Sequence, residues 1–263
     1  MPATAFLGER PTEQLAWLAC APNATETMEA RSVPDGSHLG TLPVGTPQDL
    51  AEAARRAGDA QRAWAAMPAY FRLAAFRRFA GLLDAYRPAI AEVVWAETGG
   101  TLQAADDLVG RLGPECLSLA RGTVASLRPV KHRTGLRVRA VEVRRPHGVV
   151  GLVPDPTAPF DPVTATAALV TGNGLVLVPP PGCGFSSLLL TRLFAASRLP
   201  QDLVQVVPGR AELALAAATA VDHLVLAAPL ADLSSTGGGE VAVTVGPPVD
   251  PLAFTTTALL TRR

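Results

Sequence analysis

Apolar residues recur every three to four positions in the segment that starts at Thr46. Thr46 is a typical N-cap, and Pro47 suits the first position of a helix. Leu50 and Ala57 then continue one apolar stripe, while the arginines of this segment lie largely off it. The pattern therefore predicts a helix that begins at Pro47 and ends at Pro68.

The same period continues along the chain and predicts three more helices, over residues 69–86, 88–98 and 102–121. Pro88 opens the second of these helices, and Gly122 ends the third, because proline suits a first helical turn and glycine suits the position after a last one. Together the four helices predict a helical block in the first half of the chain.

The pattern changes after this block. Residues 136–144 alternate between apolar and polar, as a half-exposed strand does. Short apolar runs then alternate with helical patterns, giving strands over 148–154, 175–178, 204–207, 224–226 and 240–245 and helices over 159–170, 185–198 and 211–218. Strands that are apolar throughout and alternate with helices predict a doubly wound parallel sheet, hence an α/β fold.

The two ends of the chain give weaker patterns. Residues 1–38 have no clear period, and we interpret them as an irregular arm with one short helix near 13–18. Residues 255–260 fit either a strand or a loose tail.

Charge narrows the functional class. Basic and acidic side chains number 23 each, so no overall attraction to nucleic acid or to an anionic membrane follows. The basic run over 128–145 has no interleaved aromatic residues, and we interpret it as the solvated edge of a strand. Residues 146–263 carry only 5 basic and 8 acidic side chains, which indicates buried elements or a face covered by a partner.

The sequence shows no targeting signal, and we therefore expect a cytoplasmic protein. The first ten residues lack a basic region with a long apolar core, and no later stretch keeps about 18 uninterrupted apolar residues. We therefore expect no secretory signal and no membrane span. The cysteines Cys20, Cys116 and Cys183 are far apart and include no CxxC, so neither a disulfide framework nor a metal site is predicted.

Short motifs follow one another in order between residues 39 and 229. They are GTLP at 40–43, AWAAMP at 63–68 followed by Arg72, ETGG at 97–100, RPHGVVG at 145–151, ALVTGN at 168–173, LP at 199–200 and VVPG at 206–209. In this order and spacing they resemble the aldehyde dehydrogenase superfamily, in the N-terminal half that binds the cofactor.

The resemblance implies a Rossmann-like doubly wound sheet preceded by a helical block, with a bridging β-strand that forms oligomers and no catalytic domain. The expected segments are an N-terminal arm (1–45), the helical part of the cofactor-type domain (46–135), the bridging strand (136–145), the Rossmann-like part of the same domain (146–246) and a C-terminal tail (247–263).

The chain departs from this family at the positions that would face the cofactor. Thr157 stands where family members have an Asn that helps to hold the thioester oxyanion, and Val178 replaces a Lys that contacts the cofactor ribose. Pro180 lies in the proline run after Val178, and Ala228 and Pro229 replace a Thr-Gly-Ser turn that faces the pyrophosphate. Because these groups donate few hydrogen bonds, we expect the chain to bind no cofactor, although residual binding of NAD or NADP is left open.

The resemblance also implies a nucleophilic Cys and a glutamate base in a second domain, downstream of Pro229. The segment after Pro229 is short, and no cysteine follows Cys183. Because thioester chemistry needs a thiolate and a base within reach, we expect no NAD(P)-dependent aldehyde oxidation by this chain alone.

Three polar residues follow the first strand of the sheet, near the edge where such folds bind ligands. Asp155, Thr157 and Asp161 are candidates for acid–base chemistry without redox, although turn formation and helix capping explain them as well. Three further candidates are interpreted as structural: Cys183, His147 and His223.

Three functional hypotheses remain. The first is a redox-dead binding or assembly module. The second is a repurposed non-redox enzyme, of cyclase or isomerase type, that acts on a hydrophobic biosynthetic metabolite in the vacated nucleotide crevice. The third is a subunit of a dehydrogenase complex. We expect a homodimer, or a complex with a partner protein, formed through the 136–145 strand and the apolar second half. We expect neither nucleic acid nor a membrane as a partner.

Overall fold

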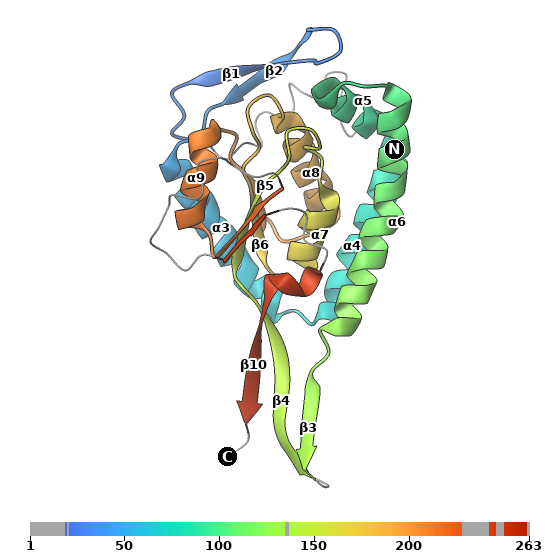
Figure 1. Cartoon of the computed structure of the whole chain (residues 1–263), viewed down its shortest axis with the longest axis vertical. Helices are drawn as coiled ribbons and strands as arrows, with labels where there is room; N and C mark the ends of the chain where they lie inside the picture. Colours follow the sequence, from blue (N-terminus) through green and yellow to red (C-terminus); the bar gives the residue numbers. More distant parts are fainter. Residues whose placement is uncertain (1–18, 20, 135–136, 228–241, 246–249, 262–263) are drawn as a thin grey trace.

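The core of the protein is a five-stranded parallel sheet (Figure 1). The computed structural model describes residues 19, 21–134, 137–227, 242–245 and 250–261. The strands are β5 (Val149–Val153), β6 (Gly174–Leu177), β7 (Val204–Val206), β8 (His223–Leu226) and β9 (Ala242–Val245). Their order is β7-β6-β5-β8-β9 and every pairing is parallel, which confirms the doubly wound sheet.

Helices cover both faces of this sheet. One face carries α3 (Pro47–Ala66) and α9 (Ala211–Ala220), and the other carries α7 (Pro162–Val170) and α8 (Gly184–Ala196). Outside α7 and α8 lie α4 (Ala69–Ala85), α5 (Arg87–Thr98) and α6 (Leu102–Ser126), three of the four helices predicted as one block. The fourth, α3, is separated from them, because its apolar stripe packs with α9 on the opposite face of the sheet. Two buried apolar clusters result, one on each face. The strands are buried on both sides, which is why they read as unbroken apolar runs.

The predicted start of α3 is confirmed by a capping box. The Thr46 hydroxyl accepts from the Asp49 backbone N–H at 3.2 Å, and the Asp49 carboxylate accepts from the Thr46 N–H at 2.9 Å. The predicted end of α6 at Gly122 is wrong, because the helix continues to Ser126. Burial of Thr123 in the next turn holds the helix beyond the exposed glycine.

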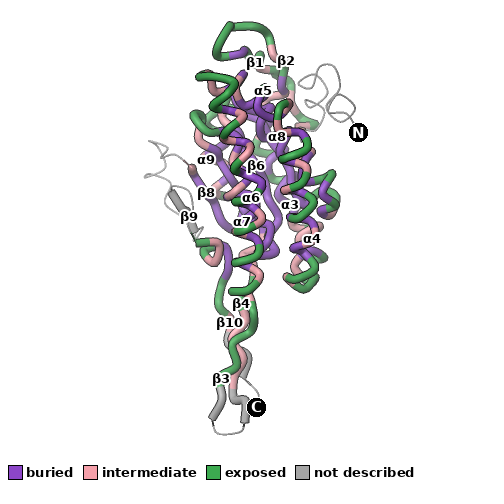
Figure 2. The backbone as a smooth tube through the Cα atoms, turned by 90° about the vertical axis from the view of Figure 1, so that its right-hand side faces the viewer, coloured by how far each residue is buried: buried purple, intermediate pink, exposed green. Residues whose placement is uncertain are grey.

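A second, antiparallel sheet forms an arm that extends from the body (Figures 1 and 2). It consists of β3 (Val130–Thr134), β4 (Arg137–Pro146) and β10 (Thr255–Thr261), in the order β10-β4-β3. The bridging strand predicted at 136–145 is therefore the central strand of three.

The segments on either side of this strand differ from the expectation. Residues 130–134 were grouped with the helices, and they pair with β4 instead. The C-terminal segment is not a loose tail. The short helix η3 (Pro251–Phe254) leads into β10, and Thr257 lies opposite Arg144 of β4.

The N-terminal segment also holds more order than predicted. The strands β1 (Thr27–Arg31) and β2 (His38–Pro43) form an antiparallel hairpin. Gly40 packs so closely on Phe185 that a Cβ would lie 2.8 Å from its ring. The Gly45 N–H donates to the Pro208 carbonyl at 2.7 Å. The hairpin therefore packs over the carboxyl edge of the parallel sheet. The helix predicted near 13–18 lies outside the described residues.

Candidate functional site

The loop that follows β5 holds two of the three polar candidates. Asp155 Oδ1 accepts from both the backbone N–H and the hydroxyl of Thr157, each at 2.7 Å. Such a contact is an Asx turn, in which a side chain satisfies the backbone two residues on. The Thr157 hydroxyl is thus directed back to its own loop, and Thr157 itself is exposed.

Asp161 has a different position and a different partner. It is the N-cap of α7, and its carboxylate accepts from the Thr164 backbone N–H at 2.9 Å. Burial raises the pKa of Asp161, and the hydrogen bonds from Thr164 partly offset this. The cap explains why α7 begins at Pro162 and not at Pro159, where the pattern placed it. A catalytic role for Asp155, Thr157 or Asp161 stays a prediction.

The end of β6 is apolar. Val178 is 2% exposed, packs with the cluster under α3 and α9, and donates its backbone N–H to the Leu152 carbonyl at 2.9 Å. The Pro180 carbonyl accepts from the Cys183 N–H at 3.2 Å, which forms the turn that leads into α8. Val178 and Pro180 thus present no side-chain donor. Ala228 and Pro229 lie outside the described residues.

The N-terminus of α8 is closed by a carboxylate from the helical block. Glu97, at the end of α5, accepts from the backbone N–H groups of Phe185 at 2.7 Å and Ser186 at 2.9 Å. It is 3% exposed, and burial raises its pKa to about 7 although the hydrogen bonds oppose this shift. The sequence analysis used Glu97 only as part of a family motif and missed this contact.

The two described cysteines are poor nucleophiles. Cys183 lies beside the candidate loop, and its thiol contacts the Pro156 carbonyl at 3.5 Å. Burial, followed by the charges of Glu97 and Asp155, raises the pKa of the Cys183 thiol to about 12. Burial raises the pKa of Cys116 to about 12 as well. Both thiols therefore stay protonated at neutral pH, which agrees with the structural interpretation of Cys183.

A small cavity adjoins Thr157. It measures ≈ 170 Å³, and Thr98, Thr101, Leu108 and Phe160 are among the residues that line it. Ligand pockets for small molecules measure about 300–1,000 Å³, so this space suits a few atoms only.

The two histidine candidates lie at the other end of the sheet. His147 precedes β5 and His223 begins β8, and their rings stack at 4.9 Å between centroids. Burial, followed by the neighbouring His147, lowers the pKa of His223 to about 4. His147 also contacts the Ala253 carbonyl at 2.9 Å. The pair joins the body to the segment that enters β10, which supports a structural role.

Comparison with known proteins identifies the family. The model of the aldehyde dehydrogenase family matches residues 20–246. The chain belongs to the aldehyde dehydrogenase family. It is 33% identical over 192 residues to a putative succinate-semialdehyde dehydrogenase [NADP(+)] of Mycolicibacterium smegmatis, covering 71% of this chain and 37% of that one. It is 32% identical over 179 residues to a vanillin dehydrogenase of an Amycolatopsis strain, covering 66% of this chain and 36% of that one.

Solved structures of aldehyde dehydrogenase family members share the fold. The NADP-dependent glyceraldehyde-3-phosphate dehydrogenase of Bacillus halodurans, complexed with NADP, aligns with a TM-score of 0.74 at 22% identity, covering 84% of this chain and 49% of that one. An NAD-dependent benzaldehyde dehydrogenase of Corynebacterium glutamicum aligns with a TM-score of 0.77 at 21% identity, covering 86% of this chain and 52% of that one. The chain thus spans about a third to a half of the length of these relatives.

Two further findings concern the described part of the chain. No helix there is both long enough and apolar enough to span a bilayer. No three His, Cys, Asp or Glu side chains among the described residues gather as a metal site would require.

Proposed function

We propose that this chain is a binding or assembly module of the aldehyde dehydrogenase family that does not oxidise aldehydes with NAD(P) on its own. One observation carries the proposal, which is that the end of β6 offers a cofactor no hydrogen-bond donor. Val178 fills this end with a buried apolar side chain where the resemblance implies a Lys, and Pro180, two residues on, has no backbone N–H. A dinucleotide needs donors and cations for its phosphates and hydroxyls, and these residues do not fit that need.

The two cysteines that the structure describes support the same proposal. An aldehyde is oxidised through attack by a thiolate, and Cys116 and Cys183 are buried thiols with a pKa near 12. A buried neutral thiol neither reacts readily nor loses its proton at neutral pH.

Turnover is the direct test of this function. The purified chain is mixed with NAD or NADP and a panel of aliphatic and aromatic aldehydes, and the absorbance of the reduced cofactor is followed. We expect no rate above the blank without protein. A rate that Cys183→Ser abolishes would overturn the proposal, because it would show a working nucleophile in this domain.

The non-redox hypothesis has weaker support. Asp155 and Asp161 hold a turn and a helix end, and the cavity beside Thr157 measures ≈ 170 Å³. A cyclase or isomerase for a hydrophobic metabolite requires more space than this. The binding or assembly module therefore remains the better interpretation of the same residues.

We further propose that the module self-associates through its arm. The strands β3 and β10 are the outer strands of the three-stranded sheet, and within the described part of the chain no further strand pairs with their outer edges. Val130, on β3, is 53% exposed and apolar. An exposed edge with an apolar residue suits pairing with a second copy of the arm, which gives a closed homodimer.

Light scattering after size exclusion tests the homodimer. We expect a dimer for the wild type and a shift toward monomer for Val130→Lys. Lys is chosen because Val130 lies opposite Glu142 on β4, so the arm keeps a favourable cross-strand pair. A wild type that stays monomeric at high concentration would contradict this proposal, and co-purification with a different chain would favour a subunit of a larger complex.

A further inference from the structure

A groove runs between α4 and α6, the two helices at the right-hand side of the body in Figure 1. It measures ≈ 430 Å³, and Gly81, Pro114 and Leu117 are among the residues that line it. The buried side of α6 packs on α7, whereas Gly81 and Pro114 are exposed. The groove is therefore a surface feature that another molecule can reach.

The two helices that form this groove run in opposite directions. A Cβ at Gly113 of α6 would lie 3.2 Å from the Ala80 carbonyl oxygen, in the second half of α4. Gly110, one turn earlier in α6, lies against Arg87, which follows α4 in the chain. The end of α4 therefore lies beside the first half of α6.

Unlike charges consequently lie at the two ends of the groove. Asp84 is in the last turn of α4, and Arg121 lies about 12 Å further along α6 than Gly113. Neither side chain forms an ion pair or a hydrogen bond with another residue that the structure describes. Arg87 is near Asp84, but its Nε is bound by Asp106 Oδ1 at 2.9 Å. Both charges of the groove are therefore available to a partner.

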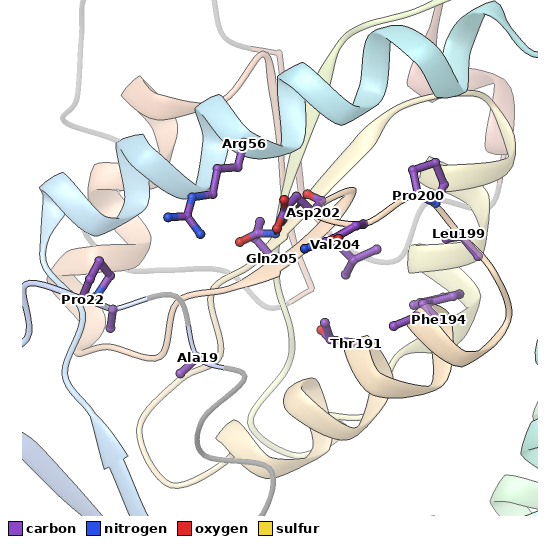
Figure 3. Close-up of a pocket in the computed structure, with 13 residues that line it drawn as sticks. Ala19, Pro22, Arg56, Thr191, Phe194, Leu199, Pro200, Asp202, Val204 and Gln205 are labelled. Atoms are coloured by element: carbon purple, nitrogen blue, oxygen red, sulfur yellow. Dashed lines mark hydrogen bonds between the residues drawn. The ribbon is translucent and has the colours of Figure 1, made fainter.

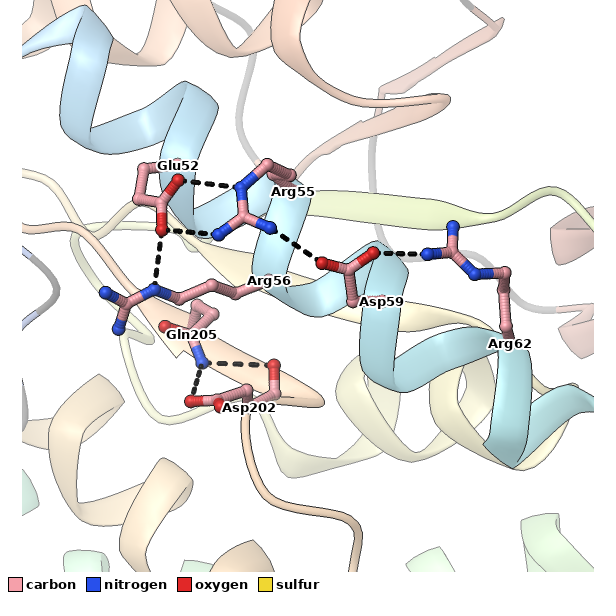
Figure 4. A network of polar contacts seen from close by, with 7 residues as sticks. All are labelled: Glu52, Arg55, Arg56, Asp59, Arg62, Asp202 and Gln205. Carbon is pink, nitrogen blue, oxygen red and sulfur yellow. Dashed lines mark hydrogen bonds and ion pairs between the residues drawn. The ribbon is translucent and has the colours of Figure 1, made fainter.

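A larger cavity beside β7 differs in this respect. It measures ≈ 530 Å³, and its Gln205 donates to the Asp202 carbonyl at 3.0 Å (Figure 3). Arg56, which also lines it, donates to Glu52 at 2.9 Å (Figure 4). Because these polar groups already have partners inside the chain, this cavity offers less to a second molecule than the groove does.

Two residues of α4 are not explained by packing within the described chain. A carboxylate in the last turn of a helix meets the negative end of the helix dipole, and the rest of this turn of α4 is apolar. Gly81 stands inside the helix, where glycine is unfavourable, and a Cβ there would meet no described atom within 4 Å. A second helix surface that approaches Gly81 closely and brings a cation to Asp84 accounts for both residues.

We propose that this groove is a contact surface for a second copy of the chain, related by a two-fold axis that crosses the groove between its two charges. Such an axis places Asp84 of each copy opposite Arg121 of the other, so that one surface complements itself. Gly81 lets the two helix pairs approach each other, and Pro114 and Leu117 supply apolar contact.

This contact is weaker than a standard interface, because the face is only two helices wide and small interfaces bind weakly. At the concentrations of size exclusion the arm therefore decides the oligomeric state, and the groove adds a contact at higher concentration. The inference does not rest on the arm, so it stands whether or not the edges of β3 and β10 pair with a second copy.

Two charge-reversed variants test the pairing directly. Both carry Val130→Lys, which keeps the arm edge out of the assay, and sedimentation velocity is measured up to millimolar concentration. Asp84→Arg alone and Arg121→Asp alone place like charges opposite each other. We expect the dissociation constant of each homodimer to rise about tenfold or more over that of the Val130→Lys parent. An equimolar mixture of the two variants restores both ion pairs in a heterodimer, and we expect the affinity of the parent to return.

An ion pair on the opposite face of the sheet supplies the matched control. Asp59 and Arg62 of α3 pair within one chain (Figure 4), so Asp59→Arg and Arg62→Asp change the net charge equally without reaching the groove. We expect both to associate as the parent does, alone and mixed. A mixture of the Asp84 and Arg121 variants that associates no better than either alone would overturn the proposal. A parent that stays monomeric at millimolar concentration would overturn it as well and would favour a different occupant.

Two glycines separate the contact from helix stability. Gly81 lines the groove and Gly122 of α6 does not, and at both positions a Cβ would meet no described atom within 4 Å. Replacement of either glycine by Gln should raise the unfolding temperature, because both lie in helices. We expect only Gly81→Gln to raise the dissociation constant about tenfold. Equal affinities of Gly81→Gln and Gly122→Gln would contradict a close approach at Gly81 and, with it, the proposed interface.

Discussion

Glu97, Arg72 and Asn173 belong to the motifs that this chain shares with its family, and each holds the fold together. Glu97 closes the N-terminus of α8. Asn173 accepts from the Gly148 N–H at 3.0 Å and donates to the Phe254 carbonyl at 3.1 Å. The residues that depart from the family, among them Thr157 and Val178, are those that would face a cofactor. Under the proposed function, this division reflects selection on the fold without selection on a cofactor site.

The ionisation of Glu97 links stability to pH. Its pKa of about 7 in the folded protein lies above the ordinary value of 4.5, so the folded state binds this proton more tightly than the unfolded chain. The stability that results is present at low pH and is lost as the pH rises through the folded value. Between about pH 5 and pH 8 we expect the free energy of unfolding of the wild type to fall by roughly 2–3 kcal/mol relative to Glu97→Gln.

Urea unfolding at several pH values measures this effect. Glu92→Gln is the matched control, because Glu92 lies on the exposed side of the same helix α5. The control should follow the wild-type pH dependence. A Glu97→Gln curve with the same slope as the wild type would show that the buried carboxyl is not the titrating group.

Arg72 is a buried cation held by carbonyls. It is 5% exposed and donates to the carbonyls of Met67 at 2.7 Å and Val170 at 3.1 Å, which joins the corner between α3 and α4 to the end of α7. Burial lowers its pKa to about 10, so it stays charged at neutral pH. Arg72→Met leaves these carbonyls without their donor and should cost about 2–4 kcal/mol of stability.

Chemical denaturation of Arg72→Met and Arg77→Met checks this prediction. Arg77 is exposed on the same helix α4, and its replacement should change the free energy of unfolding by less than about 0.5 kcal/mol. Equal losses in the two variants would contradict the structural role of Arg72.

At the scale of elements, the sequence predicts the parallel sheet and most helix starts, that of α7 excepted, but not the pairing of the arm strands. Thr46 and Pro47 mark the start of α3, because helix capping involves only residues that are neighbours in the sequence. The strand β10 reads as either a strand or a tail, because its order comes from pairing Thr257 with Arg144, far away in the chain. The role of Glu97 was missed for the same reason, since its partners lie 88 and 89 residues further on.

One buried side chain connects β10 to the body. Phe254 is fully buried at the end of η3, next to the His223 ring at 5.6 Å between centroids. Phe254→Ala should cost about 3–5 kcal/mol and speed amide hydrogen exchange in β10, because the strand loses its anchor on the body. Phe71→Ala, at a site 63% exposed, should leave exchange in β10 unchanged. Unchanged exchange in Phe254→Ala would mean that pairing with β4 alone holds the strand.

At the scale of the whole molecule, the proposed function assigns separate tasks to the body and the arm. The body keeps the α/β architecture of its family, as the sequence predicted, while its carboxyl edge is packed by the β1–β2 hairpin, Glu97 and Val178. Among the residues that the structure describes, the arm leaves the outer edges of β3 and β10 unpaired. Under the proposed function, this division suits a protein that binds and assembles.

The central claim is that the carboxyl edge no longer accepts a dinucleotide. Isothermal titration of the purified chain with NAD and with NADP tests it most directly, with an intact family member as the positive control. The account predicts no binding heat from either cofactor up to millimolar concentration. A dissociation constant in the micromolar range for NAD or NADP would contradict it.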